Sequence, residues 1–124
     1  MTLDKVFSEK CIILDLKSTN KDDLFEEMVK KIVSVQPKID LNQAVNALRD
    51  RESKMSTGIM HSIAIPHGTC SSVPHVIGAI GISKGGIDYD SLDKSPVYVV
   101  FMIIGGENET EQHIQILKQL ASVL

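Results

Sequence analysis

Apolar residues recur at helical spacing in the first half of the chain. The stretch from 21 to 35 predicts an amphipathic helix, which Pro37 ends. A second helix is predicted to begin at Asp40, because Asp40 and Gln43 form a capping box. The two apolar stripes comprise Leu24, Phe25, Met28, Val29, Ile32 and Val33 in the first helix and Leu41, Ala44, Val45 and Leu48 in the second.

The end of the chain has the same spacing. Gly105 and Gly106 open a connection, and Asn108 with Glu111 forms a capping box for a final helix. The pattern continues to the last residue without a stop signal, so a further C-terminal piece is expected. The predicted apolar face of this helix carries Ile114, Leu117, Leu120, Ala121 and Leu124.

Apolar runs mark the strands. Residues 11–16 predict a first strand, and residues 63–65 predict a brief buried strand. Pro66 must end that strand, because proline cannot donate to a sheet. Residues 76–82 and 97–104 are nearly continuous apolar runs, which favour interior strands covered on both faces.

The order of these elements predicts the fold class. Turn signals at 84–86 and 93–96 separate the later strands, and residues 53–59 are predicted to form an exposed loop. The order β-α-α-β-β-β-α favours an α/β fold, with a mixed, mostly buried β-sheet flanked by helices on both faces. Of the 124 residues 43% are hydrophobic, so the chain is predicted to bury one core as a single domain, residues 1–124.

Charge and cysteine content narrow the function classes. The net charge of −3 gives no electrostatic footprint for nucleic acid or an anionic membrane. Cys11 and Cys70 are too few and too far apart for a disulfide scaffold, and they favour reduced thiols. The start lacks the apolar run of a signal peptide, and no apolar run is long enough to span a bilayer. We therefore expect a cytoplasmic protein without direct membrane insertion.

The densest candidate chemistry lies in residues 56–68. His67 follows the brief strand and is mounted between a proline and a glycine, which suits a nucleophilic imidazole with an open face. Just upstream, Arg51 carries a cation and Ser56 and Thr57 carry hydroxyls, groups that bind oxyanions. This set favours a histidine that takes up and hands on a phosphoryl group. The alternative is a structural histidine, which is the commoner role for a lone buried imidazole.

Other interpretations stay open for the neighbouring residues. Arg51 also suits a solvated cation at a helix C-terminus, and Ser56 and Thr57 suit an ordinary loop or cap. His61 lies close to His67, but the segment lacks the ligand spacing of a zinc site. A hydrolase that uses Ser56 is disfavoured, because no acid is placed to complete a triad.

The motifs resemble a known family. The chain is similar to the fructose/mannitol/nitrogen-type enzyme IIA domain of the bacterial phosphoenolpyruvate-dependent phosphotransferase system in segments 51–52, 56–59, 63–68, 86–90, 96–97 and 112–117. The resemblance covers essentially the whole chain in the family's order. It implies the enzyme IIA fold and the function of a phosphoryl carrier, a phosphotransferase component.

The resemblance also implies roles for individual residues. His67 matches the family's phosphorylated histidine, with Nε2 as the implied acceptor atom. His113 matches a second histidine near the first, and Arg51 matches an arginine beside the phosphorylation site; both would stabilise the phosphate. Ser56 and Thr57 match the loop that borders this site. No metal or other cofactor is expected, because both ends of each transfer are protein side chains.

Partners follow from the same resemblance. It implies the histidine-containing phosphocarrier protein as donor, and a downstream enzyme IIB component or a regulatory target protein as recipient. The partner surface would surround His67, with Ile59 and Met60 as apolar contacts. The rival hypothesis is a nitrogen-type regulatory module, which binds partner proteins according to its phosphorylation state without feeding sugar transport. Residues 86–96 resemble that branch somewhat more.

Two features depart from the family's pattern. Gly105 and Gly106 stand where many members have an Ala-Pro or Val-Pro turn, which leaves the placing of His113 open. Members also continue beyond the point where this chain stops, so the family's C-terminal helix is expected to be lacking. A domain that binds partners without being phosphorylated is disfavoured by the combined presence of Arg51, His67 and His113.

Overall fold

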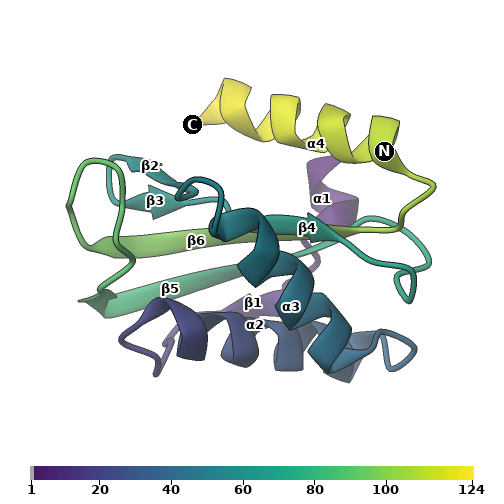
Figure 1. The fold of residues 1–124 in the computed structure, drawn as a ribbon, viewed down its shortest axis with the longest axis horizontal. Helices are drawn as coiled ribbons and strands as arrows, with labels where there is room; N and C mark the ends of the chain where they lie inside the picture. The colour runs from purple at the N-terminus through teal and green to yellow at the C-terminus, as the bar shows by residue number, and fades with distance from the viewer. Residues whose placement is uncertain (1) are drawn as a thin grey trace.

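A mixed β-sheet separates two layers of helices in the computed structural model, which describes residues 2–124 apart from the side chains of residues 59 and 60. The layer with α1 (Leu3–Val6) and α4 (Thr110–Val123) covers one face, and α2 (Lys21–Val35) and α3 (Leu41–Glu52) cover the other (Figure 1). The strands are β1 (Ile12–Ile13), β2 (Gly58–Met60), β3 (Ile63–Ala64), β4 (His67–Thr69), β5 (Ile77–Ile87) and β6 (Val97–Gly105), and Glu9–Cys11 forms a 3-10 turn. This arrangement confirms the predicted fold class.

The two long strands form the centre of the sheet. Its order is β1-β5-β6-β3-β2, with β4 also paired to β6. The β5–β6 and β2–β3 pairs are antiparallel, and the other pairs are parallel. No helix among the described residues is long and apolar enough to cross a membrane.

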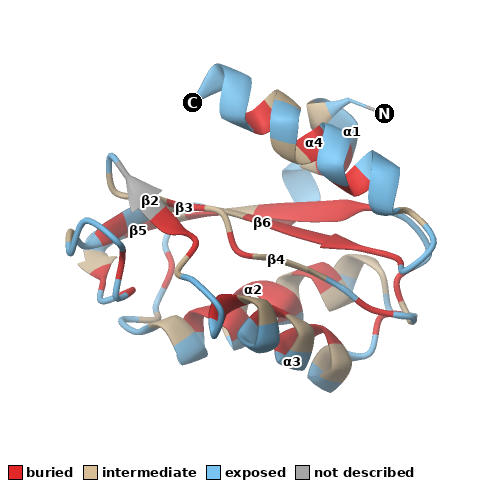
Figure 2. Cartoon of the chain, turned by 45° about the horizontal axis from the view of Figure 1, so that its top comes forward, coloured by how far each residue is buried: buried red, intermediate tan, exposed pale blue. Residues whose placement is uncertain are grey.

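Side chains of β6 alternate between two hydrophobic clusters, as the two-residue period of a strand requires. Val100, Met102 and Ile104 belong to the large cluster with α2 and α3, whereas Ile103 belongs to a smaller one with α1 and α4. Figure 2 shows buried residues on both sides of the sheet and exposed residues on the outer side of each helix. The alternation places Gly105, two residues after Ile103, on the face towards α4.

β3 and β4 are two pieces of one interrupted strand along β6. Ile63 pairs with Val99 and His67 pairs with Ile103, so the register is the same on both sides of the break. The break covers Ile65 and Pro66, so the strand ends one residue earlier than predicted; proline has no N–H for the ladder. The strand does end before His67, as predicted. However, the chain pairs with β6 again from His67 onward, so His67 is the first residue of β4.

Residues 84–86, which include Gly85 and Gly86, do not form the predicted turn. They lie inside β5, where the pairing with β6 slips: Ile82 pairs with Val99, but Ile87 pairs with Val97. The extra residues form a bulge, and Gly86 has a φ of +89° that suits glycine. The glycines therefore mark a bulge and not a turn; both structures use backbone conformations that glycine adopts readily.

Helix boundaries were predicted better than helix caps. Residues 21–35 form α2 as predicted, and Asp40 caps α3 by accepting from the Gln43 N–H at 2.9 Å. The Gln43 side chain does not reach back to Asp40, as a capping box requires; it bonds to Ser71 and Ser72 instead. The box predicted for α4 is wrong, because the N-cap is Glu109, without a side-chain cap bond.

Two further predictions need correction. The strand predicted over residues 11–16 is confined to β1, because Cys11 belongs to the 3-10 turn. The segment 53–59, predicted to be an exposed loop, contains the buried Thr57 and enters β2 at Gly58.

Candidate functional site

A cleft of about 400 Å³ lies between α3 and α4, beside the edge of β4 that pairs with no described strand. Its walls include Arg51 and Lys54 from the C-terminal end of α3 and the following turn, His67 from β4, and Thr110 and His113 from α4. Three segments far apart in the sequence thus meet at one place. The cleft combines cations, imidazoles and hydroxyls.

The backbone fixes the orientation of the His67 ring. Its Nδ1 lies 2.9 Å from the Ile65 carbonyl oxygen. A carbonyl can only accept, so Nδ1 carries the proton and Nε2 keeps the lone pair. Partial burial lowers the pKa of His67, the Ile65 carbonyl raises it, and the nearby Arg51 lowers it. The net shift is downward, which favours a neutral, nucleophilic imidazole.

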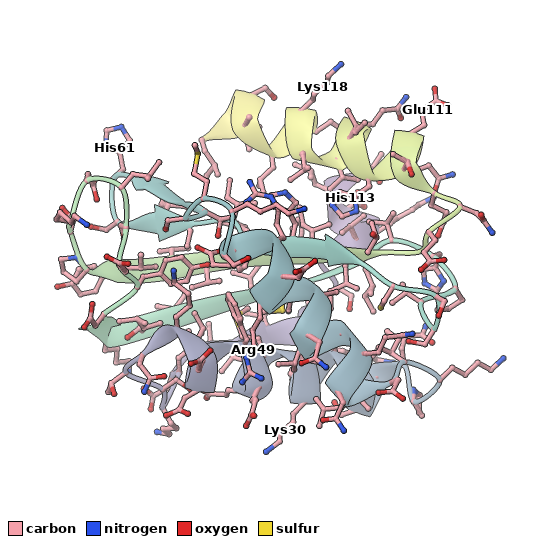
Figure 3. All side chains as sticks on the ribbon, in the orientation of Figure 1. Lys30, Arg49, His61, Glu111, His113 and Lys118 are labelled. Atoms are coloured by element: carbon pink, nitrogen blue, oxygen red, sulfur yellow. The ribbon has the colours of Figure 1, made fainter. Side chains whose placement is uncertain are left out.

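His113 lies against His67. The ring centroids are 5.7 Å apart and the rings are inclined at 63°. In Figure 3 His113 points from α4 towards the sheet, whereas Glu111 and Lys118 point away from it. A β-carbon on Gly105 would lie only 2.6 Å from His113 Nδ1, so this glycine makes room for the ring. The Gly105 departure noted in the sequence therefore supports the placing of His113 at the cleft.

His113 is buried without a hydrogen-bond partner. Its side chain is 5% exposed, and neither ring nitrogen is bonded within the described structure. Burial and the neighbouring His67 lower the pKa of His113 to about 4. Both imidazoles are therefore neutral at pH 7. Two buried nitrogens without hydrogen-bond partners cost folding free energy. An anion beside the ring would favour protonation of His113, because the ring could then donate a hydrogen bond to it.

Arg51 lies on the cleft, whereas the similar Arg49 does not. Arg51 donates to the Met55 carbonyl oxygen at 2.9 Å, a contact that leaves further N–H groups of its guanidinium for a ligand. Arg49 instead contacts Asp22 and Glu26. The structure thus brings together three residues that the sequence singled out: Arg51, His67 and His113.

Ser56 and Thr57 do not line the described part of the cleft. Ser56 Oγ accepts from the Gly58 N–H at 3.1 Å. Thr57 is buried, and its hydroxyl donates to Glu52 at 2.6 Å and lies 2.7 Å from the Tyr89 hydroxyl. Both hydroxyls therefore hold the segment between α3 and β2 in place.

Some cleft residues were not singled out from the sequence. Lys54, Thr69 and Thr110 line the cleft, and only their place in the fold reveals it. Lys54 adds a second cation beside Arg51. The predicted partner contacts Ile59 and Met60 have side chains outside the described residues. Within the described part of the chain, no three metal-binding side chains are grouped.

A family model described as "Phosphoenolpyruvate-dependent sugar phosphotransferase system, EIIA 2" matches residues 5–124. The chain belongs to this EIIA family. The match spans nearly the whole chain, and it includes the elements that build the cleft.

Relatives of this EIIA domain include fructose-specific and nitrogen regulatory proteins. The chain is 36% identical to the fructose-specific EIIABC component of Bacillus subtilis, over 100% of the chain but only 20% of the relative. It therefore spans about a fifth of that protein. It is 32% identical to the fructose-specific EIIA component of Haloferax volcanii, over 91% of the chain and 73% of the relative. It is 28% identical to the nitrogen regulatory protein of Pseudomonas aeruginosa, over 98% and 79%.

Solved structures confirm the fold. The nitrogen regulatory protein IIA-Ntr of Neisseria meningitidis superposes with a TM-score of 0.88, at 28% identity over 97% of this chain and 82% of that one. The mannitol IIA of Escherichia coli superposes with a TM-score of 0.75, at 22% identity over 94% and 82%. The second likeness supports the fold alone.

Proposed function

We propose that this EIIA domain is a phosphoryl carrier that accepts a phosphoryl group on Nε2 of His67. The observation that carries the proposal is the hydrogen bond from His67 Nδ1 to the Ile65 carbonyl oxygen. It holds a neutral imidazole with its second nitrogen as nucleophile, on a cleft that also contains Arg51. Membership of the EIIA family supports the same reading.

The transfer step needs few groups. The Nε2 lone pair of His67 forms a bond to phosphorus while the bond from phosphorus to the donor's histidine nitrogen breaks. The electron pair of that bond returns to the donor imidazole. The proton of His67 stays on Nδ1 throughout, hydrogen-bonded to the Ile65 carbonyl oxygen, so His67 does not have to lose a proton.

Cleft residues balance the incoming charge. Arg51 is placed to donate to the equatorial phosphoryl oxygens, and charge-assisted bonds of this kind are the strong ones. His113 is placed to take up a proton when the dianion arrives, because the buried ring then gains an acceptor. Together these two residues stabilise the phosphorylated form.

The proposed donor is the histidine-containing phosphocarrier protein, and the proposed recipient is an enzyme IIB component. A solved complex of mannitol enzyme IIA with phosphorylated enzyme IIB from Escherichia coli has this fold in the IIA partner, with a TM-score of 0.74. The surface around the cleft is apolar as well as basic: Met55 is 60% exposed and Ile114 is 47% exposed. Exposed apolar groups beside a reactive residue suit a protein partner.

A regulatory function is the second candidate. It is favoured by the 0.88 TM-score to IIA-Ntr and by several nitrogen regulatory proteins among the relatives. In this case the phosphoryl group on His67 would change which protein binds the cleft surface. The same site chemistry serves both functions, because only the recipient differs.

Intact-protein mass spectrometry tests the carrier function. The chain is incubated with phosphoenolpyruvate, enzyme I and the phosphocarrier protein, beside a His67→Ala control. One acid-labile phosphoryl group on the wild type and none on the variant are expected. No mass change with several phosphocarrier donors would refute the proposal. Addition of a fructose-type enzyme IIB domain then separates the candidates: rapid loss of the phosphoryl group favours transport, and retention favours regulation.

A further inference from the structure

Glu52 is a buried acidic side chain between α3 and the segment that leads to β2. It is 8% exposed and is the last residue of α3, next to Arg51. Burying a carboxylate is expensive unless its oxygens are bonded. Here the carboxylate accepts from the Thr57 N–H at 2.8 Å, the Thr57 hydroxyl at 2.6 Å and the Tyr89 hydroxyl at 3.2 Å. The ammonium of Lys21 lies 3.1 Å away.

These bonds continue from Glu52 to His67 through the backbone. The Thr57 N–H donates to the Glu52 carboxylate, and the Thr57 carbonyl oxygen accepts from the Ile65 N–H at 3.0 Å. The Ile65 carbonyl oxygen in turn accepts from His67 Nδ1 at 2.9 Å. Every link has ordinary hydrogen-bond length. This series of hydrogen bonds therefore connects the buried carboxylate of Glu52 to His67, the proposed nucleophile, through Thr57 and Ile65.

We propose that Glu52 is a positioning residue for His67, which fixes the tautomer and orientation of the imidazole through Thr57 and Ile65. The proposal rests on the function proposed above for His67, but its geometry does not depend on a phosphoryl donor. The hydrogen bond made by one ring nitrogen of a histidine sets its tautomer and ring orientation, so a group that fixes the acceptor of that bond also fixes the ring. Here Thr57 and Ile65 connect the carboxylate to the imidazole. The Ile65 carbonyl can accept from His67 because it lies at the break between β3 and β4.

The rest of the network anchors Glu52 itself. Lys21 begins α2 and lies 4.6 Å from the centre of the Tyr89 ring, so one ammonium contacts both the ring and the carboxylate. Tyr89 is 1% exposed and follows β5. Glu52 is thus bonded to groups from α2, from the segment before β2 and from the end of β5. Such multiple anchoring gives the carboxylate a fixed position from which to hold Thr57.

Several charged groups act on His67 besides Glu52. Arg51 of α3 lowers the pKa of His67 and Glu52 raises it, although burial has the largest effect. Lys54, Asp50 and the neutral His113 also line the cleft. Removal of the Glu52 charge should therefore lower the pKa of His67 further, in addition to loosening its Nδ1 bond.

Nitrogen-15 NMR of the histidine rings tests the proposal without any phosphoryl donor. In the wild type we expect His67 to be the Nδ1–H tautomer, with the Thr57 and Ile65 amides as protected from exchange as those of β6. In Glu52→Gln we expect a mixture of tautomers, a lower His67 pKa and, in the phosphorylation assay, a rate about tenfold lower. Unchanged tautomer, pKa and rate in a folded Glu52→Gln protein would overturn the proposal.

Tyr89→Phe is the matched control. It removes a hydrogen bond to the same carboxylate but leaves the link from Glu52 to the Thr57 N–H. We expect it to lose stability while His67 keeps the wild-type tautomer and pKa. Equal disturbance of His67 by both variants would overturn the proposal, because the role of Glu52 would then be structural only.

The wild-type measurements decide the matter if Glu52→Gln does not fold. An Nε2–H tautomer of His67, or Thr57 and Ile65 amides that exchange far faster than β6, would overturn the proposal. Failure of the carrier function gives a different result, namely a wild type that gains no phosphoryl group while its His67 tautomer and protected amides are as expected.

Discussion

The His67 and His113 rings lie 5.7 Å apart, although one belongs to β4 and the other to α4. Gly105 makes this approach possible, because a β-carbon at that position would be 2.6 Å from His113 Nδ1. Both rings are neutral at pH 7; His113 is buried, whereas His67 is half-buried and lines the cleft. A phosphoryl group on His67 would therefore lie beside a neutral His113 ring, which can still take up a proton.

His113 should make the protein less stable at mildly acidic pH. Its pKa is about 4 in the folded protein and about 6.5 when unfolded, so the unfolded chain binds more protons in this window. The free energy of unfolding is expected to fall as pH drops from 6.5 to 4, by up to about 3 kcal/mol. Urea denaturation at pH 7, 6, 5 and 4 measures this. His113→Phe should flatten that part of the profile; an equally steep profile would assign it to other groups.

Gly105→Ala should displace His113. The added methyl group must push the ring or the strand aside, and overpacking of this kind costs about 1–3 kcal/mol. Gly85→Ala is the control, because a β-carbon there meets nothing within 4 Å. Urea denaturation gives the two stabilities, and NMR shifts of the His113 ring report its position. Equal stability of the two variants would show that the sheet absorbs the methyl group at no cost.

Arg51→Gln should slow phosphorylation of His67, and Arg49→Gln should not. Only Arg51 lies on the cleft, whereas Arg49 contacts Asp22 and Glu26 on the outside. Loss of a charge-assisted contact to the phosphoryl oxygens is expected to lower the rate about tenfold or more. Time-resolved mass spectrometry with the phosphocarrier donor measures both variants. A similar decrease in the two would point to a general effect of positive charge on the encounter.

Thr57→Val should act on stability more than on the cleft. The change removes the hydroxyl that bonds Glu52 and Tyr89 but keeps the shape and the backbone bonds. Leaving buried polar groups short of a partner costs about 1–3 kcal/mol. Ser56→Ala, which loses only a bond from the Gly58 N–H, should cost less. Denaturation midpoints give the stabilities of the two variants. A lower phosphorylation rate in Thr57→Val without loss of stability would contradict this expectation and support the binding role that the family resemblance implies.

Local patterns predicted much of the fold. Residues 21–35 form α2 because their apolar side chains recur at helical spacing and can be buried on one side. The apolar run 97–104 forms β6 because its side chains are apolar on both faces of a covered sheet. The face of α4 was predicted less well. Leu120 is buried as predicted, but Ile114 and Leu124 are exposed, and the buried face also contains His113 and Ile116. A search for apolar residues leaves out His113, whose polar ring packs close to Gly105.

The candidate site divides in the same way. Sequence alone placed His67 after a proline-ended strand and indicated Arg51 as a nearby cation, and resemblance to a family added His113. Neither could show that Thr57 is buried against Glu52, because that contact needs Tyr89, which lies far along the chain. Lys54 and Thr110 join the cleft for the same reason, since α3 and α4 line one cleft only in the folded protein.

The sequence by itself determined the helices, the central strands and the break at Pro66, since these depend on side-chain periodicity and on a missing N–H within a few residues. Only the tertiary structure decided which nitrogen of His67 is free, how His113 fits beside it and why Glu52 is buried. The fit of His113 and the burial of Glu52 depend on contacts between segments that are distant in sequence, and the free nitrogen of His67 depends on the position of the Ile65 carbonyl in the folded backbone. Their energies depend on burial and on partners within about 3 Å, distances that only packing sets.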